Sequence, residues 1–332
     1  MPTDLAVMTM EESGVADGRL LVVCKDDRSL DLLDLRGGRS LGVVLSSGVS
    51  PHEVIASLDG TIAYLPVYSD APVGHAGSDG RAIDIVDLVE PALVRTERIP
   101  FAARPHLPQL GSDGMLYVSA ELDESICVFD PHGMRLAGRL PTGAPQSHMF
   151  AISADGTSIA VANVQPGSVS IIDLREGSLR GVVNVAAKIN RISFDAESRM
   201  AFTADQDTPR LAVIDTRDLR VVDWIALPGL GFGSAVTADG ERLVIALRST
   251  SQVAVVDLRT RSVVGVVDVP PRPQSIVLEP TGRYAYSACS EVDLVVEVDL
   301  ERLCVQRLIP TGRNPDGLAW APVPPSVAAQ TH

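Results

Sequence analysis

Apolar runs that end in aspartate recur along this chain at a nearly constant interval. Seven such runs end at Asp34, Asp87, Asp130, Asp173, Asp215, Asp257 and Asp299, with spacings of 53, 43, 43, 42, 42 and 42 residues. The runs are short and rich in Val, Ile and Leu, as in "VSIIDL" and "VAVVDL", which indicates strands. The pattern therefore predicts seven copies of one structural unit.

The order of elements within each unit is also constant. An apolar strand leads to an Asp-Gly-type turn, and a second strand such as "SIAVAN" follows. A loop then connects to the Asp-ended strand, which turns into a fourth strand such as "VVGVVDV". Seven such four-stranded antiparallel units predict an all-β fold, a seven-bladed β-propeller that spans residues 1–332 as a single domain.

The two ends of the chain are predicted to share blade one. The N-terminal segment "GRLLVVCKDDRSLDLLDLRGGRSLGVVL" supplies three strands, and the C-terminal "PTGRNPDGLAWAP" begins a unit and then stops. The C-terminal "GLAWAP" is therefore expected to form the innermost strand, which closes the ring and leaves no open sheet edge. In an alternative closure, "DLAVMTM" at residues 4–10 forms that strand and "GLAWAP" is peripheral.

One repeat carries a resemblance to a known family. The segment "DGTSIAVANVQPGSVSIIDLREGSLRGVVNV" resembles the repeat of YVTN-type seven-bladed β-propellers, and the likeness covers essentially the whole chain. The Tyr-Val-Thr-Asn core is degenerate here, reading "YLPV", "YVSA", "AVAN", "FTAD", "VIAL" and "YSAC". Members of that family include surface-layer and lipoprotein-like scaffolds, and the wider seven-bladed relatives include lactonases, a muconate-cyclising enzyme, streptogramin lyases and copper-binding selenium-binding proteins. The resemblance therefore implies a fold and leaves the function open.

The composition excludes several kinds of partner. The formal net charge of −14 opposes binding to nucleic acid and to anionic membranes. The N-terminus lacks the pattern of a secretion signal, and no apolar run is long enough to span a membrane, so we expect a cytoplasmic protein. The four cysteines, Cys24, Cys127, Cys289 and Cys304, lie far apart and are expected to be free thiols. The sequence gives no indication of the oligomeric state.

Three histidines occupy the same place in three consecutive units. His52, His106 and His148 each lie seven residues before an Asp-Gly turn and make up half of the six histidines. In a propeller this position begins the innermost strand at one rim of the channel, which we call the upper mouth. Asp316 holds the position in the adjoining blade; the remaining blades carry Ile189 or Asn190, Phe232 and Gln274.

Converging imidazoles favour a metal centre, because neutral imidazole is the commonest metal ligand in proteins. His52, His106 and His148 are thus predicted to bind zinc, iron, manganese or copper, with Asp316 as a possible additional ligand. The alternative is that the three side chains hydrogen-bond channel water or a substrate anion.

The loops that leave the second strands reach the same rim. Their equivalent positions carry Asp26, Tyr68, Glu121, Arg248 and Ser290, with Asp205 one place earlier. Glu121 is predicted to act as a general base or an extra ligand. Tyr68 and Arg248 are predicted to bind a carboxylate or phenol group of the substrate, although ordinary packing or exposure is the alternative for both.

The first interval of 53 residues marks an insertion of about ten residues relative to the other repeats. It lies in "YSDAPVGHAGSDGR", residues 68–81, between the second and third strands of blade two. Its polar, Gly-rich composition predicts a flap over the mouth that brings His75 within reach as a further ligand. A plain solvent loop is the alternative.

These features together predict a metal-dependent enzyme, a lyase, isomerase or lactone hydrolase, that acts on a small polar organic molecule at the upper mouth. One rival is a non-catalytic interaction scaffold, and another is a metal-free lactonase or cyclase that uses His and Arg. The Asp-Gly turns lie on the opposite, lower face and are expected to be structural.

Overall fold

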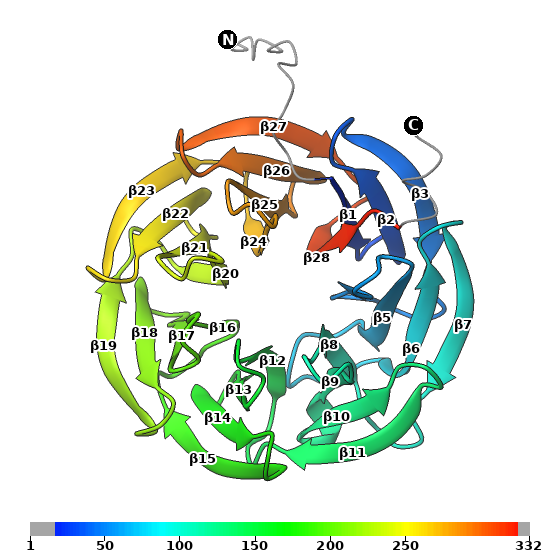
Figure 1. The fold of residues 1–332 in the computed structure, drawn as a ribbon, viewed down its shortest axis with the longest axis horizontal. Helices are drawn as coiled ribbons and strands as arrows, with labels where there is room; N and C mark the ends of the chain where they lie inside the picture. The colour runs from blue at the N-terminus through cyan, green and yellow to red at the C-terminus, as the bar shows by residue number, and fades with distance from the viewer. Residues whose placement is uncertain (1–16, 325–332) are drawn as a thin grey trace.

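The computed structural model describes residues 17–324, which form seven four-stranded antiparallel sheets arranged in a ring (Figure 1). This confirms the predicted seven-bladed β-propeller. The innermost strands are β28 (Pro315–Pro322), β4 (Ile55–Ala56), β8 (Pro105–Leu110), β12 (Ser147–Ile152), β16 (Ile192–Phe194), β20 (Gly231–Val236) and β24 (Pro273–Leu278). The second strands are β1 (Gly18–Cys24), β5 (Ile62–Ser69), β9 (Leu116–Ala120), β13 (Ser158–Asn163), β17 (Met200–Ala204), β21 (Arg242–Leu247) and β25 (Tyr284–Cys289).

The outer half of each blade is as regular as the inner half. The third strands are β2 (Ser29–Asp34), β6 (Asp79–Asp87), β10 (Ser125–Asp130), β14 (Ser168–Asp173), β18 (Arg210–Asp215), β22 (Gln252–Asp257) and β26 (Leu294–Asp299). The fourth strands are β3 (Arg39–Leu45), β7 (Ala92–Arg98), β11 (Arg135–Pro141), β15 (Ser178–Asn184), β19 (Arg220–Ala226), β23 (Ser262–Asp268) and β27 (Cys304–Pro310). A single 3-10 turn, η1 (Glu121–Asp123), follows β9. Within residues 17–324 there is no helix long and apolar enough to cross a membrane.

Blade one is closed by both ends of the chain. The C-terminal strand β28 pairs antiparallel with β1, with Gly18 opposite Pro322 and Leu20 opposite Trp320, and β2 and β3 complete the sheet (Figure 1). The predicted closure by "GLAWAP" is therefore confirmed, and the segment "DLAVMTM" of the alternative lies outside the described residues.

The burial of each strand follows its position in the blade. The second strands β9 and β25 are buried at every residue, since both faces of each blade pack against neighbouring blades. The fourth strands, such as β23, alternate between exposed and partly buried residues, as expected at the outer edge. Continuous apolar runs thus mark the inner part of each blade, and alternating runs mark the rim.

The Asp-Gly turns of the lower face are structural, as predicted. The Asp59 carboxylate accepts hydrogen bonds from the Thr61 amide and the Ser57 hydroxyl, and Asp113, Asp155 and Asp239 accept equivalent amide bonds in their blades. Each following glycine has a positive φ, for example +77° at Gly114. In blade five, where no Asp-Gly pair exists, Ser198 takes that conformation with φ +59°.

A β-bulge recurs where the innermost strand begins. In blade three, Pro105 pairs with Ala120 and Pro108 with Val118, so that two residues, His106 and Leu107, oppose one. The same register shift occurs in blades one, four, six and seven. Because a bulge bends the strand and re-aims its side chains, it directs this part of each inner strand toward the channel.

Candidate functional site

His52, His106 and His148 meet at the upper mouth, as predicted from their shared offset. The ring centroids of His106 and His148 are 3.7 Å apart with the planes tilted by 34°, and the His52 ring lies 5.4 Å from that of His106. His106 and His148 are buried, and the Nδ1 atom of each has no hydrogen-bond partner. Two buried imidazole nitrogens are thus left without a hydrogen bond, and Glu121 Oε2 lies 3.8 Å from Nδ1 of His148.

The surroundings of the three rings keep them uncharged. Burial, together with the nearby His52 and Arg191, lowers the pKa of His148 to about 3. Burial also lowers the pKa of His52 to about 4, although Asp316 opposes this shift, and it holds the pKa of His106 well below its usual range. Neutral imidazoles can accept a proton or donate a lone pair to a metal ion.

Tyr68 and Glu121 lie beside the histidines, as predicted, although Glu121 is fully committed to other residues. The Tyr68 ring is 4.5 Å from the ring of His106, and its hydroxyl donates to Glu121 Oε2. Glu121 Oε1 accepts hydrogen bonds from Gly74 N at 2.8 Å and from Arg104 Nη1 at 3.0 Å. Since both carboxylate oxygens already have donors, this arrangement favours a role in positioning Tyr68 over that of a free base.

The insertion is attached to the blade by a residue that sequence reasoning missed. Arg104, 1% exposed, donates to Asp79, to the Ser69 hydroxyl and to the main-chain oxygen of His75 in addition to Glu121. These hydrogen bonds hold the insertion, residues 68–81, against the blade. The His75 side chain is exposed and contributes only its carbonyl oxygen to this network, so nothing places its imidazole among the candidate ligands.

The opposite side of the mouth is formed by charged residues. Asp316 lies where it was predicted, with Oδ2 3.1 Å from Lys25 Nζ and 3.5 Å from His52 Nδ1. Burial opposes ionisation of Asp316, but Lys25, His52 and Arg191 together hold its pKa below its usual range. Asp316 therefore links the cations of the mouth to the imidazoles.

Two further charged residues at the channel, Glu53 and Arg191, were not expected. Arg191 Nη2 lies 2.5 Å from Glu53 Oε1 and 3.5 Å from Asp316 Oδ1. The pair borders a cavity of about 170 Å³ lined from all seven blades. In blade five the prediction favoured Ile189 or Asn190. The next residue, Arg191, directly before β16, is the one that reaches across to Glu53 and Asp316.

The backbone of Glu53 packs closely against Gly317 of blade one, which has no side chain to obstruct it. A Cβ on Gly317 would lie 2.7 Å from the Cα of Glu53, and the Gly317 amide donates to the His52 carbonyl at 2.9 Å. Burial raises the pKa of Glu53 to about 7, opposed by Arg191.

Arg248 lies on the same rim, on the side away from the histidines. Its guanidinium carbon is 4.2 Å from the centroid of the Phe232 ring, and Arg191 lies 5.2 Å from the same centroid. Burial lowers the pKa of Arg248 to about 10, with Arg272 contributing in the same direction. The structure thus brings His52, His106, His148, Tyr68, Glu121 and Asp316 together and places Arg248 across the mouth from the histidines.

The histidine nitrogens are suitable donors for a metal ion, but the present arrangement of the rings is not that of a metal site. Within residues 17–324, no three His, Cys, Asp or Glu side chains are arranged to share one ion. His106 and His148 stack on each other, so their rings would have to rotate apart before both could approach one ion at the ~2.0–2.1 Å typical of zinc. The unpartnered Nδ1 atoms are nevertheless free for such a bond.

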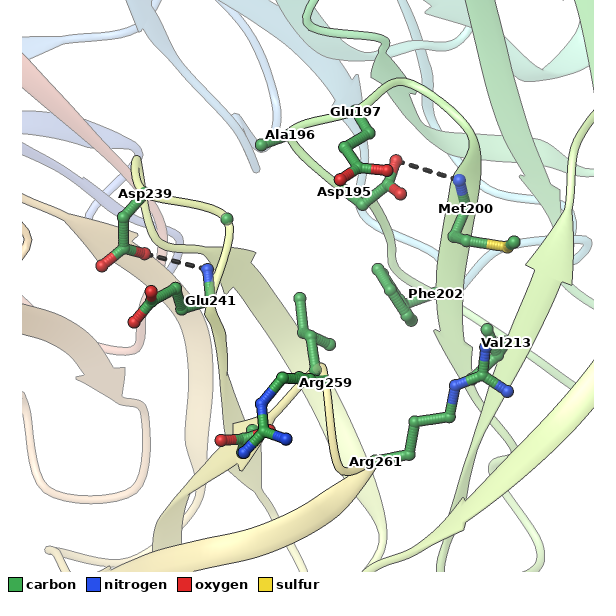
Figure 2. Close-up of a pocket in the computed structure, with 13 residues that line it drawn as sticks. Asp195, Ala196, Glu197, Met200, Phe202, Val213, Asp239, Glu241, Arg259 and Arg261 are labelled. Carbon is green, nitrogen blue, oxygen red and sulfur yellow. Dashed lines mark hydrogen bonds between the residues drawn. The ribbon is translucent and has the colours of Figure 1, made fainter.

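A larger hollow of about 580 Å³ lies on the lower face, between blades five and six (Figure 2). Its acidic side chains belong to turns: Asp195 accepts the amide of Met200, and Asp239 accepts that of Glu241 (Figure 2). Because these carboxylates already satisfy turn amides, this hollow is explained by the structural role of the lower face, and the upper mouth is the candidate site.

The comparisons with known proteins show the fold. No family model and no curated protein matches the chain. Similar solved structures include Kuenenia stuttgartiensis hydrazine synthase, 17% identical with a TM-score of 0.69, covering 89% of this chain and 99% of that one. The dihydro-heme d1 dehydrogenase NirN, in complex with DHE, is 16% identical with a TM-score of 0.68, covering 96% of this chain and 78% of that one. At these identities the similarity shows a shared propeller fold, and membership of the YVTN family stays a prediction.

Proposed function

We propose that the upper mouth is the site of a metal-dependent enzyme that acts on a small polar organic molecule, with His52, His106 and His148 as the metal ligands. The observation that supports this most is the pair of buried, unpartnered Nδ1 atoms on His106 and His148. Leaving two such atoms unsatisfied costs free energy unless a ligand occupies them. Zinc, iron, manganese and copper all bind imidazole.

The remaining residues of the mouth suit the binding and orientation of a substrate. A bound metal ion would polarise a carbonyl or carboxylate oxygen, which suits lyase, isomerase or lactone-hydrolase chemistry. Tyr68 is 1% exposed, packs its ring 4.5 Å from that of His106 and donates its hydroxyl to Glu121, so it supports the position of the histidine rings. The docked insertion gives this side of the mouth a fixed wall. A cytoplasmic location belongs to the same proposal and rests on the composition.

Metal analysis tests the proposal directly. Tag-free protein purified without chelators should contain about one transition-metal ion per chain, measured by inductively coupled plasma mass spectrometry. His106→Ala should lower the affinity for that ion at least about tenfold, since even outer-shell substitutions at metal sites cost that much. The exposed His132, in a lower-face turn, provides the control: His132→Ala should retain the metal.

The result that would overturn the proposal is equally concrete. Wild-type protein that stays empty after incubation with zinc, iron(II), manganese and copper excludes the metal centre. Equal metal content in His106→Ala and wild type, with both folded by circular dichroism, excludes these ligands.

A metal-free enzyme is the second candidate, favoured by the absence of a preformed three-ligand arrangement among the described residues. In that case the neutral imidazoles act as hydrogen-bond or proton acceptors for the substrate. Protein that binds no metal but whose ligand binding depends on His106 would support it. If neither metal binding nor ligand binding depends on His106, the non-catalytic interaction scaffold is the candidate that remains.

A further inference from the structure

One arginine at the mouth, Arg248, forms no ion pair with any acid among residues 17–324, although Asp316 and Glu291 lie near enough to act on its charge. Lys25 pairs with Asp316, and Arg191 pairs with both Glu53 and Asp316. For Arg248, no carboxylate among residues 17–324 lies within ion-pairing distance. Arg248 is only partly exposed, so its guanidinium has lost part of its hydration without gaining a partner.

The guanidinium is held in place by a flat aromatic surface. It stacks on Phe232, 4.2 Å from the ring centroid, and the Arg191 guanidinium lies 5.2 Å from the same centroid. The Arg248 amide donates to the Leu230 carbonyl at 3.0 Å, which fixes the backbone where β21 ends. A stacked guanidinium keeps its planar fork of N–H donors free for a planar anion.

There is space for a ligand in front of this fork. Arg248 lines a hollow of about 330 Å³ together with Gln206, Ser249 and Ser251. A neighbouring hollow of about 380 Å³ contains Lys25 and Gln274.

Gln274 gives a second, independent sign of a missing ligand. Its side chain is 4% exposed, its Nε2 atom donates to Ser290, and its Oε1 atom has no partner. A ligand that carries a hydrogen-bond donor would satisfy Oε1, as its carboxylate would satisfy Arg248.

We propose that Arg248 is the carboxylate-binding residue of the mouth, so that the substrate is a small organic acid anchored on the Phe232-stacked guanidinium with its other end toward the histidines. This rests on the proposed function, because it names the substrate class of the same site. One unpaired cation matches one carboxylate. Asp316, next to His52 and Lys25, disfavours a more highly charged anion such as phosphate near the imidazoles.

Binding of simple probes tests the proposal without knowledge of the substrate. Isothermal titration at constant ionic strength would compare benzoate and succinate with the uncharged benzamide and succinamide, and with inorganic phosphate. We expect the wild type to prefer each carboxylate to its amide. Arg248→Gln should weaken carboxylate binding at least about tenfold, and Arg248→Lys should give an intermediate loss because it keeps a charge but not the fork.

Arg210 provides a matched control on the same face. It also stacks on an aromatic ring, with its guanidinium carbon 3.8 Å from the centroid of Trp224, but it pairs with Asp205. Arg210→Gln should bind the probes within about twofold of wild type, since its charge is already balanced.

Three results would overturn the inference: no carboxylate binding by the wild type, equal affinity for acid and amide, or unchanged binding in Arg248→Gln. Phosphate binding stronger than carboxylate binding would overturn the assigned class of ligand. Metal content, measured on the same samples, separates this inference from the proposed function. If the protein contains no metal but binds carboxylates in a way that depends on Arg248, only the metal centre is refuted. If the protein contains metal but shows no Arg248-dependent carboxylate binding, only the carboxylate site is refuted.

Discussion

The Arg104 guanidinium joins the insertion to the Glu121 carboxylate through hydrogen bonds, and its backbone leads directly into β8. Burial alone would lower the pKa of Arg104, but Glu121, Tyr68 and Asp79 together raise it. Its backbone has φ +49°, and Gln146, Arg272 and Asn314 take the same conformation before their own inner strands. The backbone geometry is thus a property of the repeat, whereas the guanidinium network joins the insertion of blade two to Arg104 and Glu121 of blade three.

Replacing Arg104 tests what that network contributes. Arg104→Gln should lower the free energy of unfolding by about 3–5 kcal/mol, because it leaves the buried Glu121 carboxylate without its cation. The same variant should become sensitive to proteolysis between residues 70 and 78, where the insertion loses its attachment. Urea denaturation and limited proteolysis provide the two measurements.

Two further variants separate the buried charge from a general effect of losing an arginine. Arg139→Gln removes an exposed ion pair with Asp123 and should cost less than about 1 kcal/mol. The double variant Arg104→Gln, Glu121→Gln should recover part of the loss. An Arg104→Gln protein as stable as wild type, with the insertion still protected, would show that the loop is held by other contacts.

The turns between the first and second strands show how element geometry depends on single residues. Gly114 has φ +77°, and a Cβ added there would meet no atom within 4 Å. Gly114→Ala therefore tests backbone strain alone and should cost about 1–2 kcal/mol. Gly138 has equally open surroundings without a positive φ, so Gly138→Ala should be neutral or slightly stabilising. Equal effects of the two variants in chemical denaturation would mean that the turn does not require glycine.

The inner strands explain how much of the site could be predicted from sequence. The repeat interval fixed equivalent positions, so the convergence of His52, His106 and His148 and the place of Asp316 followed from counting residues. Glu53 and Arg191 were missed, because the rule took one channel position per blade, and each of these residues directly follows the position that the rule considered.

Contacts between blades were beyond the reach of sequence reasoning. The bonds of Arg104 to the insertion, and of Glu121 to Tyr68 and Gly74, depend on how far side chains extend between segments 25 to 53 residues apart. The one available signal was an arginine preceding Pro105 at the start of an inner strand, and this signal has no specific chemical meaning by itself.

At the scale of the whole molecule, the ring is held together by the pairing of β28 with β1. Without β28, the apolar side chains of β1, all buried, would face water, and β1 would become an open sheet edge. Blade two would also lose the hydrogen bond between the Gly317 amide and the His52 carbonyl. The effect of losing the last strand should therefore reach the candidate site as well as blade one.

Deleting residues 312–332 tests this closure. The truncated chain should melt at least about 10 °C lower than the full chain, as expected for a loss of several kcal/mol in a protein of this size. A rearranged chain supplies the control: residues 312–324, a short Gly-containing turn, then residues 17–311. Since Gly18 lies opposite Pro322, that turn would form a hairpin and restore β28 beside β1. Calorimetry should show recovery of most of the lost stability in the rearranged chain, and a truncated chain that melts with the full chain would refute closure by β28.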